Sequence, residues 1–261
     1  MTARFRLGTT SFIHPGGWLA NVERLAGRVD DVEILFFESG GFASECEARG
    51  LAEWKIRGGL TYSLHTPLDA SLASADEDRR RASVAQVAGA VAAARPFAPE
   101  MVIVHVYLGD GENDPSPPGD LGAWRRRAGR SLEELLGTGI PARDLCVEVL
   151  DYDFAHVEPV VKDLGLSIAL DVGHLVRDGR DEAALLSRHL ARTRVIQWHG
   201  VDASGRDHRG LAHYPPARAR WLVDTLVAEG YEGVVTLEVF RAADLEESLA
   251  VVASLLGERA R

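Results

Sequence analysis

The feature that most constrains this chain is a repeated alternation of strand signals and helix signals. Strand-like apolar runs are found at Phe5–Thr9, Val32–Phe37, Leu60–His65, Val102–Val106, Leu145–Val149, Ser167–Asp171, Val195–His199 and Val234–Val239. Helical periodicity follows each of them, at Trp18–Val29, Ala43–Ile56, Asp78–Ala94, Ala123–Leu136, Phe154–Leu164, Glu182–Ala191, Pro216–Ala228 and Ala243–Leu256. Eight such units in 261 residues fit a closed (β/α)8 barrel better than a doubly wound open sheet. We therefore predict an α/β protein with the TIM barrel fold. No linker divides the chain, so we expect a single domain over residues 1–261.

Local signals mark several connections. Asp76 precedes an acidic first turn, and Pro215-Pro216 stands where the seventh helix begins, both typical of helix N-termini. The longest break in regular structure, Leu108–Gly122, follows the fourth strand, on the face where barrel active sites lie. We expect this segment to be either a mobile lid over the barrel mouth or a plain surface loop.

Composition excludes several classes of protein. A hydrophobic content of 46% and a charged content of 26% are ordinary for a globular protein. The net charge of -10 argues against nonspecific attraction to nucleic acid or to an anionic membrane. With no membrane-length apolar run and no signal-peptide pattern, we expect a cytoplasmic protein. Cys46 and Cys146 lack any CxxC spacing, so we expect buried small hydrophobes rather than a metal or redox pair.

Residues with metal-ligand side chains stand at or near the ends of six strands. They are His65, His105, Glu148, Asp171, His199 and Glu238. Side chains two positions earlier share their face of the strand, and these are mostly small or polar: Ser63, Ile103, Cys146, Ala169, Gln197 and Thr236. The intervening positions are apolar, so the ligand-type residues should face the barrel axis. Any one of them alone reads as a hydrogen-bonded core histidine or a surface acid. Together they indicate divalent metal ions, because converging unpaired carboxylates repel one another and lose hydration. Three histidines and three carboxylates suit Zn, Mn or Fe.

Further ligand-type residues lie in loops. His174 follows Asp171 by three residues, and we expect Gly173 to permit a tight turn between them. Asp207, His208 and His213 follow the seventh strand, where capping or exposed polar roles compete with metal binding. Three other histidines fit surface or packing roles: His14, His156 and His189.

The ligand set resembles that of the xylose-isomerase-like barrels, and within them the apurinic-site endonuclease branch of phosphodiesterases (AP endonuclease family 2). The resemblance implies one metal at His65, His105 and Glu148, and a second metal at Asp171, His199 and Glu238, with Glu148 as the bridge. It implies a third metal at His174 and His208, with Asp207 as the acid. This chain departs from the family pattern, which is Asp-x-His, because Arg206 stands at the acid position and Asp207 is adjacent to His208. Neighbouring side chains in extended backbone diverge, which argues against the third ion.

Finer phrases resemble the cobamide-remodelling phosphodiesterases. These phrases are RLGTTSFIHP, DDVEILFFES, YSLHTPLDASLASAD, LCVEVLDYDF, LSIALDVGHL, RVIQWHGVDASGRDHRGLAH and VVTLEVFRAADLEESL. The resemblance implies a cobamide substrate, that is, a cobalamin-type corrinoid. The bond cut would be the nucleotide-loop phosphodiester, giving cobinamide phosphate and the lower-ligand riboside for salvage.

The implied roles follow from metal-assisted hydrolysis. Glu148 would fix the metal spacing, and Glu238 would orient or deprotonate the attacking water. His174 and His208 would bind phosphate through a third ion or directly as imidazolium donors. Phosphate-clamping or simply solvated arginines follow the ligands: Arg177, Arg180, Arg206 and Arg209. Aromatic residues near the mouth are candidates for corrinoid contacts or for packing: Phe12, Tyr107, Trp124, Tyr152 and Tyr214.

Three other functions stay open. A sugar isomerase or epimerase with one metal would use only the quartet Glu148, Asp171, His199 and Glu238. An abasic-site DNA endonuclease needs basic and wedge side chains around the mouth. The basic runs Arg79–Arg81 and Arg125–Arg127 fall on predicted helices instead, and we expect the first to form a solvated, self-neutralised face. A corrinoid or metal-binding protein without turnover is the third.

Overall fold

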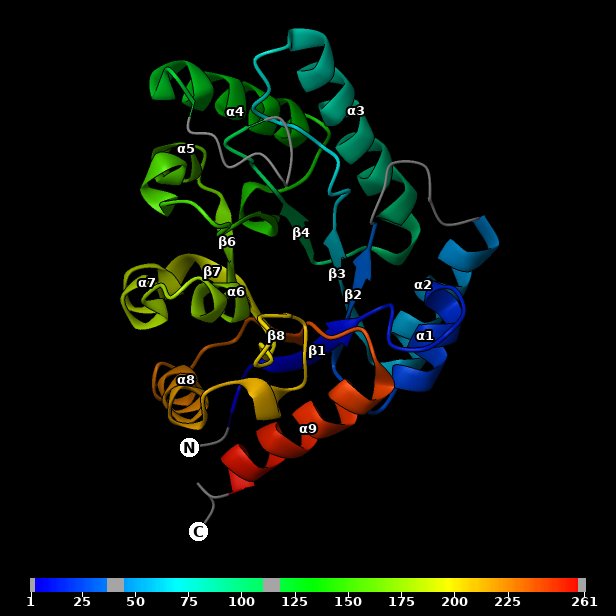
Figure 1. Ribbon diagram of the computed structural model, residues 1–261. Helices are drawn as coiled ribbons and strands as arrows, with labels where there is room; N and C mark the ends of the chain where they lie inside the picture. The colour runs from blue at the N-terminus through cyan, green and yellow to red at the C-terminus, as the bar shows by residue number, and fades with distance from the viewer. Residues whose placement is uncertain (1–2, 37–44, 110–117, 258–261) are drawn as a thin grey trace.

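Eight parallel strands close into a barrel in the order of the sequence (Figure 1), in a computed structural model that describes residues 3–36, 45–109 and 118–257. The barrel closes where β8 pairs with β1, and this confirms the predicted TIM barrel. The strands are β1 (Arg6–Thr10), β2 (Asp31–Leu35), β3 (Thr61–His65), β4 (Met101–Val104), β5 (Leu145–Glu148), β6 (Ser167–Asp171), β7 (Thr193–Trp198) and β8 (Val234–Leu237).

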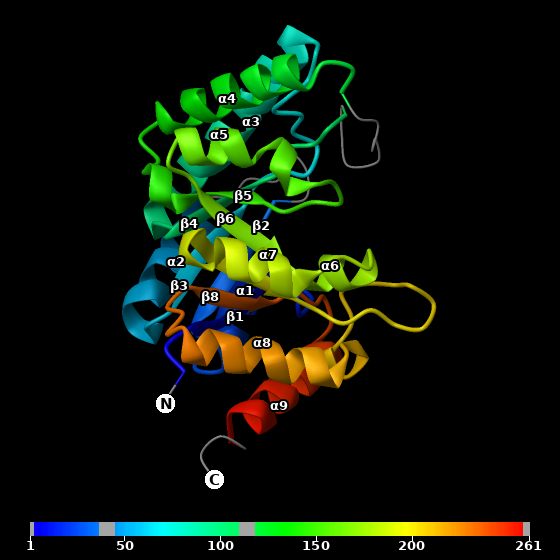
Figure 2. The ribbon, with the colours of Figure 1, turned by 90° about the vertical axis from the view of Figure 1, so that its left-hand side faces the viewer.

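Helices surround the barrel (Figures 1 and 2). The α-helices are α1 (Trp18–Leu25), α2 (Glu45–Gly58), α3 (Glu77–Ala94), α4 (Leu121–Leu136), α5 (Glu158–Asp163), α6 (Val172–Arg177), α7 (Glu182–His189), α8 (Pro216–Ala228) and α9 (Ala242–Gly257). Short 3-10 helices are η1 (Arg95–Phe97), η2 (Ala142–Asp144), η3 (Phe154–His156), η4 (Leu190–Arg192) and η5 (Leu211–His213). Asp76 accepts hydrogen bonds from two amides in the first turn of α3, and Pro216 is the first residue of α8, as predicted. None of the described helices is long and apolar enough to cross a membrane.

The structure differs from the predicted elements in three places. The first predicted helix ends at Leu25, because Ala26 has an extended ψ of 129°. The span Phe154–Leu164 divides into η3 and α5. The short helix α6, which the sequence patterns did not predict, starts directly after β6, because the Asp171 carboxylate caps it by accepting from the amide of His174. Residues 37, 43–44 and 110–117, which belong to predicted elements and to the proposed lid, lie outside the described residues.

Two apolar layers hold the barrel, as the alternation of side chains predicts. The outer layer packs strands against helices and includes the intervening strand residues Leu64, Val104, Val147, Leu170, Trp198 and Leu237. A smaller cluster fills the barrel itself: Met101, Ile103, Cys146, Ala169, Val195 and Val234. Cys146 is a free, buried thiol, as expected, whereas the side chain of Cys46 lies outside the described part.

Candidate metal centre

The ligand-type residues meet at the carboxyl end of the barrel. His65, Glu148 and Asp171 are the last residues of β3, β5 and β6. His105, His199 and Glu238 each follow a strand by one residue. Because parallel strands all end at the same face, these six side chains converge there. Figure 2 shows α6 and the yellow segment after β7, which carry the loop candidates, projecting from one end of the barrel.

The first group consists of His65, His105 and Glu148. Glu148 Oε2 lies 3.2 Å from His65 Nε2 and 2.9 Å from His105 Nε2. The two imidazoles meet edge to face, with 4.8 Å between ring centroids. One ligand atom from each residue lies within 4.8 Å of the others, so the three side chains can share one ion.

The second group consists of Asp171, His199 and Glu238, whose ligand atoms also lie within 4.8 Å of one another. Asp171 Oδ1 lies 3.3 Å from His199 Nε2, and Asp171 Oδ2 lies 2.7 Å from His174 Nδ1. Glu148, Asp171 and His174 form a further group of the same kind, so Glu148 belongs to both halves of the centre. This shared position is the one that a bridging carboxylate requires.

The loop after β7 brings His208 into the centre. His174, His199 and His208 form the fourth group, and the rings of His199 and His208 stack with 4.4 Å between centroids. His208 has a φ of +53°, in the left-handed region, so the backbone turns between residues 207 and 208 instead of running extended. The expected divergence of Asp207 and His208 therefore does not occur.

Asp207 contacts the histidines rather than joining a ligand group. Asp207 Oδ1 lies 3.0 Å from His208 Nδ1, and Oδ2 lies 3.4 Å from His174 Nε2. Among the described residues it belongs to none of the four groups. Arg206, at the acid position of the family pattern, forms an exposed ion pair with Asp202 instead.

The donor set fits divalent transition metal ions. Asp171 Oδ2, His199 Nε2 and Glu238 Oε2 are buried, and in the described structure none makes a hydrogen bond of normal geometry. Buried polar atoms without partners cost free energy, and a shared cation would remove that cost. Imidazole nitrogens with carboxylate oxygens are ligands that Zn, Mn and Fe accept.

Electrostatics in the metal-free site reflect the crowding of charges. Burial disfavours the imidazolium of His65, but the Glu148 carboxylate overcomes this effect and raises the pKa of His65 to about 9. Burial likewise opposes protonation of His174, while Asp171 raises its pKa to about 11. Burial, followed by the charge of Asp171, raises the pKa of Glu238 well above its ordinary value. Protons thus occupy positions that a cation would compete for.

Neighbouring groups orient two of the histidines. His65 Nδ1 lies 3.0 Å from the carbonyl of Thr66, and His105 Nδ1 lies 2.5 Å from the Tyr107 hydroxyl. Both contacts leave Nε2 directed at Glu148, as metal-ligating histidines require. Tyr107 was a candidate for corrinoid contact, and its place beside His105 gives it an orienting role. The sequence signal was its spacing of two from His105, which puts both side chains on one face of an extended segment.

The structure corrects the interpretation of Gly173. This residue lies inside α6 and is not among those with positive φ, so no tight turn requires it. A β-carbon at this position would instead come within 2.5 Å of the His199 ring. Glycine is needed here for close packing.

The candidate arginines are all engaged within the chain. Arg177 pairs with Asp178 and Asp207, and so borders the centre. Arg180 donates to the carbonyl of Leu150, and Arg209 lies near Asp202 and Asp244. In the basic runs, Arg80 is only 2% exposed and pairs with Glu77 and Glu134, which corrects the expectation of a wholly solvated face.

The remaining candidates lie apart from the centre. Trp124, Tyr152 and Tyr214 are buried core residues, which favours packing over corrinoid contact. His213 is exposed, whereas His156 stacks on Tyr152 and His189 packs against Phe154.

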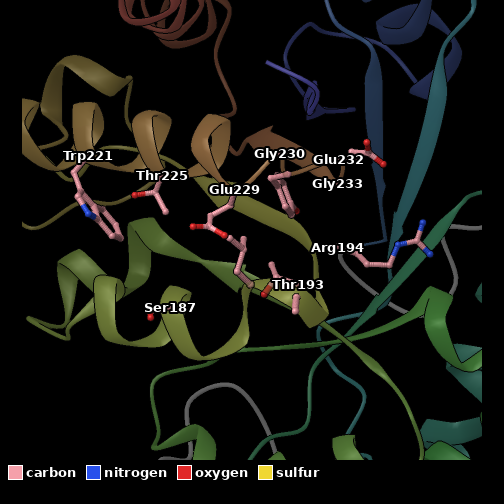
Figure 3. Close-up of a pocket in the computed structure, with 12 residues that line it drawn as sticks. Ser187, Thr193, Arg194, Trp221, Thr225, Glu229, Gly230, Glu232 and Gly233 are labelled. Atoms are coloured by element: carbon pink, nitrogen blue, oxygen red, sulfur yellow. The ribbon is translucent and has the colours of Figure 1, made fainter. Parts of the chain in front are cut away.

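A cavity of about 960 Å³ lies at the other end of the barrel (Figure 3). Thr193 and Gly233 line it where β7 and β8 begin, and Trp221 and Thr225 of α8 lie to one side. No ligand-type residue of the centre lines this cavity.

Comparisons with known proteins agree with this architecture. The sequence profile of a family described as "Xylose isomerase-like TIM barrel" matches residues 23–255. No curated protein sequence matches significantly. Similar solved structures include a D-tagatose 3-epimerase-like protein, at 19% identity and a TM-score of 0.79, covering 98% of this chain and 100% of that one. Endonuclease IV from Thermus thermophilus has 22% identity and a TM-score of 0.71, covering 97% and 99%. D-Psicose 3-epimerase from Clostridium cellulolyticum has 16% identity and a TM-score of 0.70, covering 98% and 96%. At these identities the structural likeness shows a shared fold.

Proposed function

This chain belongs to the xylose isomerase-like TIM barrel family, a family of metal-dependent enzymes, and from that premise we propose that it is a metal-dependent phosphodiesterase. The observation that supports the proposal is the number of imidazoles at the barrel mouth. Four histidines beyond the isomerase-type quartet take part in the overlapping ligand groups: His65, His105, His174 and His208. An enzyme with one metal has no use for them, whereas hydrolysis of a phosphodiester uses two or three ions.

The residues would divide the work as follows. Divalent ions held by these groups would supply Lewis acidity toward the phosphate oxygens and lower the pKa of a water molecule. Glu148 would keep the two halves of the centre at a fixed distance. Glu238, buried and with Oε2 unpartnered among the described residues, would orient that water and accept its proton. His174 and His208, each about a fifth to a quarter exposed, lie toward the open side and would hold the phosphate.

We propose a cobamide as the substrate, on the strength of the sequence resemblance. The cut would release cobinamide phosphate and the lower-ligand riboside in the cytoplasm. A DNA duplex is a poorer fit, because the basic runs make internal contacts. Arg80 is buried against Glu77, Arg125 donates to the carbonyls of Ala155 and His156, and Arg127 donates to that of Ala73.

One observation favours a second candidate, a sugar epimerase. The quartet Glu148, Asp171, His199 and Glu238 is complete, and two of the structural relatives above are titled as 3-epimerases. In that reaction the two glutamates would move protons at carbon.

The test is an anaerobic incubation of the protein, loaded with Zn, Mn or Fe, with adenosylcobalamin, followed by mass spectrometry. We expect cobinamide phosphate and a riboside, no product after chelation, and a loss of turnover in Glu148→Gln far larger than its loss of substrate affinity. Parallel reactions contain abasic duplex DNA and D-tagatose. A nicked duplex or an epimerised sugar with intact corrinoid would replace the proposal with the corresponding alternative.

A further inference from the structure

A carboxylate that the sequence patterns did not single out lies inside the barrel beneath the centre. Glu33 of β2 is fully buried, and among the described residues neither of its oxygens has a hydrogen-bond partner. It pairs in register with Ser63 on β3, and His65 lies two residues further along the same face. Glu33 is therefore one inward-facing level below the first ligand group.

The groups that act on Glu33 are known from the structure. They are the His65 imidazole, the carboxylates of Glu148 and Asp31, and the hydroxyl of Thr236. Thr236 lies close but makes no hydrogen bond of normal geometry with the carboxylate. Burial, together with the charges of Glu148 and Asp31, raises the pKa of Glu33 to about 7. The ionised form therefore carries a free-energy cost in the folded, metal-free chain.

Asp31, on the same face of β2, shows what a satisfied carboxylate looks like in this barrel. Its two oxygens accept hydrogen bonds from Ser63 at 2.7 Å and from Thr61 at 2.6 Å. Glu33 is as deeply buried and has no such donors in the described structure. The difference requires an explanation outside the hydrogen bonding of the fold.

Glu33 belongs to a polar side of the barrel interior. Gln197 of β7 and Thr236 of β8 are register neighbours, both fully buried, and their polar side-chain atoms also lack partners among the described residues. Gly8 of β1 lies between β8 and β2 and has no side chain, so inward-facing groups of those two strands approach each other across it. The interior on the side of β4 to β6 is apolar instead.

We propose that Glu33 is a positioning residue for the metal centre, supplying negative charge beneath the ions held by His65, His105 and Glu148. This inference rests on the proposed metal-dependent function. A carboxylate in the low-dielectric interior attracts a nearby divalent ion strongly, although it is not itself a ligand. The same carboxylate destabilises the chain when no ion is bound. Its retention in the barrel and the absence of donors around it in the described structure follow from one cause.

The test is Glu33→Gln, which keeps the size of the side chain and removes the charge. We expect the affinity for Zn²⁺ and Mn²⁺, measured by competition with a chromophoric chelator, to fall by about tenfold to a hundredfold. We expect the melting temperature of the metal-free protein to rise by several degrees, because a buried charge is gone. Glu33→Asp, which keeps the charge, should retain more of the affinity than Glu33→Gln does.

The matched control is Glu158→Gln. Glu158 is also a buried glutamate, but it lies on α5 and is paired with Lys162 and Arg188. Its substitution should lower the melting temperature and leave metal affinity unchanged. A Glu33→Gln protein with wild-type metal affinity, or with a lower metal-free melting temperature, would overturn the inference alone. A wild-type protein that binds no divalent metal would overturn both this inference and the proposed function.

Discussion

The α-carbon of Gly173 lies against the imidazole of His199. A β-carbon on residue 173 would come within 2.5 Å of Cδ2, Cε1 and Nε2 of that ring. His199 is itself fully buried, so it has little room to move aside. Helix α6 can therefore begin directly at the end of β6, with Asp171 as its cap, because residue 173 is glycine.

Gly173→Ala is expected to push the His199 ring away from Asp171 and Glu238. We expect metal affinity to fall by about tenfold or more, as measured by chelator competition. The control is Gly129→Ala in α4, where the nearest atom to a new β-carbon is 3.8 Å away. That substitution should leave metal affinity unchanged and raise the free energy of unfolding by up to about 1 kcal/mol. Wild-type affinity in Gly173→Ala would show that the contact is not restrictive.

Tyr107→Phe removes the hydroxyl that lies 2.5 Å from His105 Nδ1. Without this partner the His105 ring loses its fixed orientation, and we expect about a tenfold loss of metal affinity. Tyr152→Phe removes a hydroxyl that donates to the carbonyl of Val106 and touches no ligand. It should cost about 1 kcal/mol in the free energy of unfolding and leave metal affinity intact. Equal affinities in the two variants would argue against an orienting role for Tyr107.

Asp207→Asn tests whether the acid that serves this site is Asp207, although the family pattern has it one residue earlier. Asp207 contacts His174, His208 and Arg177, so we expect kcat to fall by about tenfold to a hundredfold as these groups lose alignment. Arg206→Ala removes an exposed side chain paired with Asp202 and should leave kcat unchanged. The measurement is steady-state kinetics on the substrate identified above. A larger effect at Arg206 than at Asp207 would contradict this assignment.

Arg80→Ala is expected to destabilise the fold without changing the site. Arg80 is buried and donates to Ser131, Glu77 and Glu134, so its removal should cost about 1–3 kcal/mol, through lost packing and an unpartnered Ser131 hydroxyl. Arg81→Ala, at an exposed position 68% accessible, should change stability by less than about 0.5 kcal/mol. Chemical denaturation measures both, and similar values for the two would refute the assignment.

The stability difference at Arg80 should also depend on pH. The hydrogen bond from Arg80 lowers the pKa of Glu77 to about 2, below its ordinary value of 4.5. The stabilisation from this pair is therefore fully present above about pH 4.5 and is lost as the pH falls toward 2. Denaturation of wild type and Arg80→Ala at pH 7 and at pH 3 should show a smaller difference at the lower pH. A larger difference at pH 3 would mean that Glu77 is not the partner that matters.

The sequence by itself determined the barrel and the direction of its strand side chains. Alternation at period two placed Leu64 and Trp198 in the outer layer and Cys146 and Ala169 inside, because a strand side chain has only two faces to choose from. The same rule brings His65, Glu148 and Asp171 to one end, since parallel strands end together. The signal for Glu33 was present in the alternation of Asp31, Glu33 and Leu35, but a strand-end search passes over a residue inside the strand.

The tertiary structure decided what depends on contacts between distant segments. The closeness of Gly173 to His199, the burial of Arg80 and the absence of donors around Glu33 in the described structure arise from elements far apart in the chain. The left-handed turn at His208, which lets Asp207 and His208 converge, occurs at a residue without the propensity of glycine. Local patterns fix which face a side chain takes, because that choice is made by backbone geometry. What lies opposite that face is set by how the barrel closes.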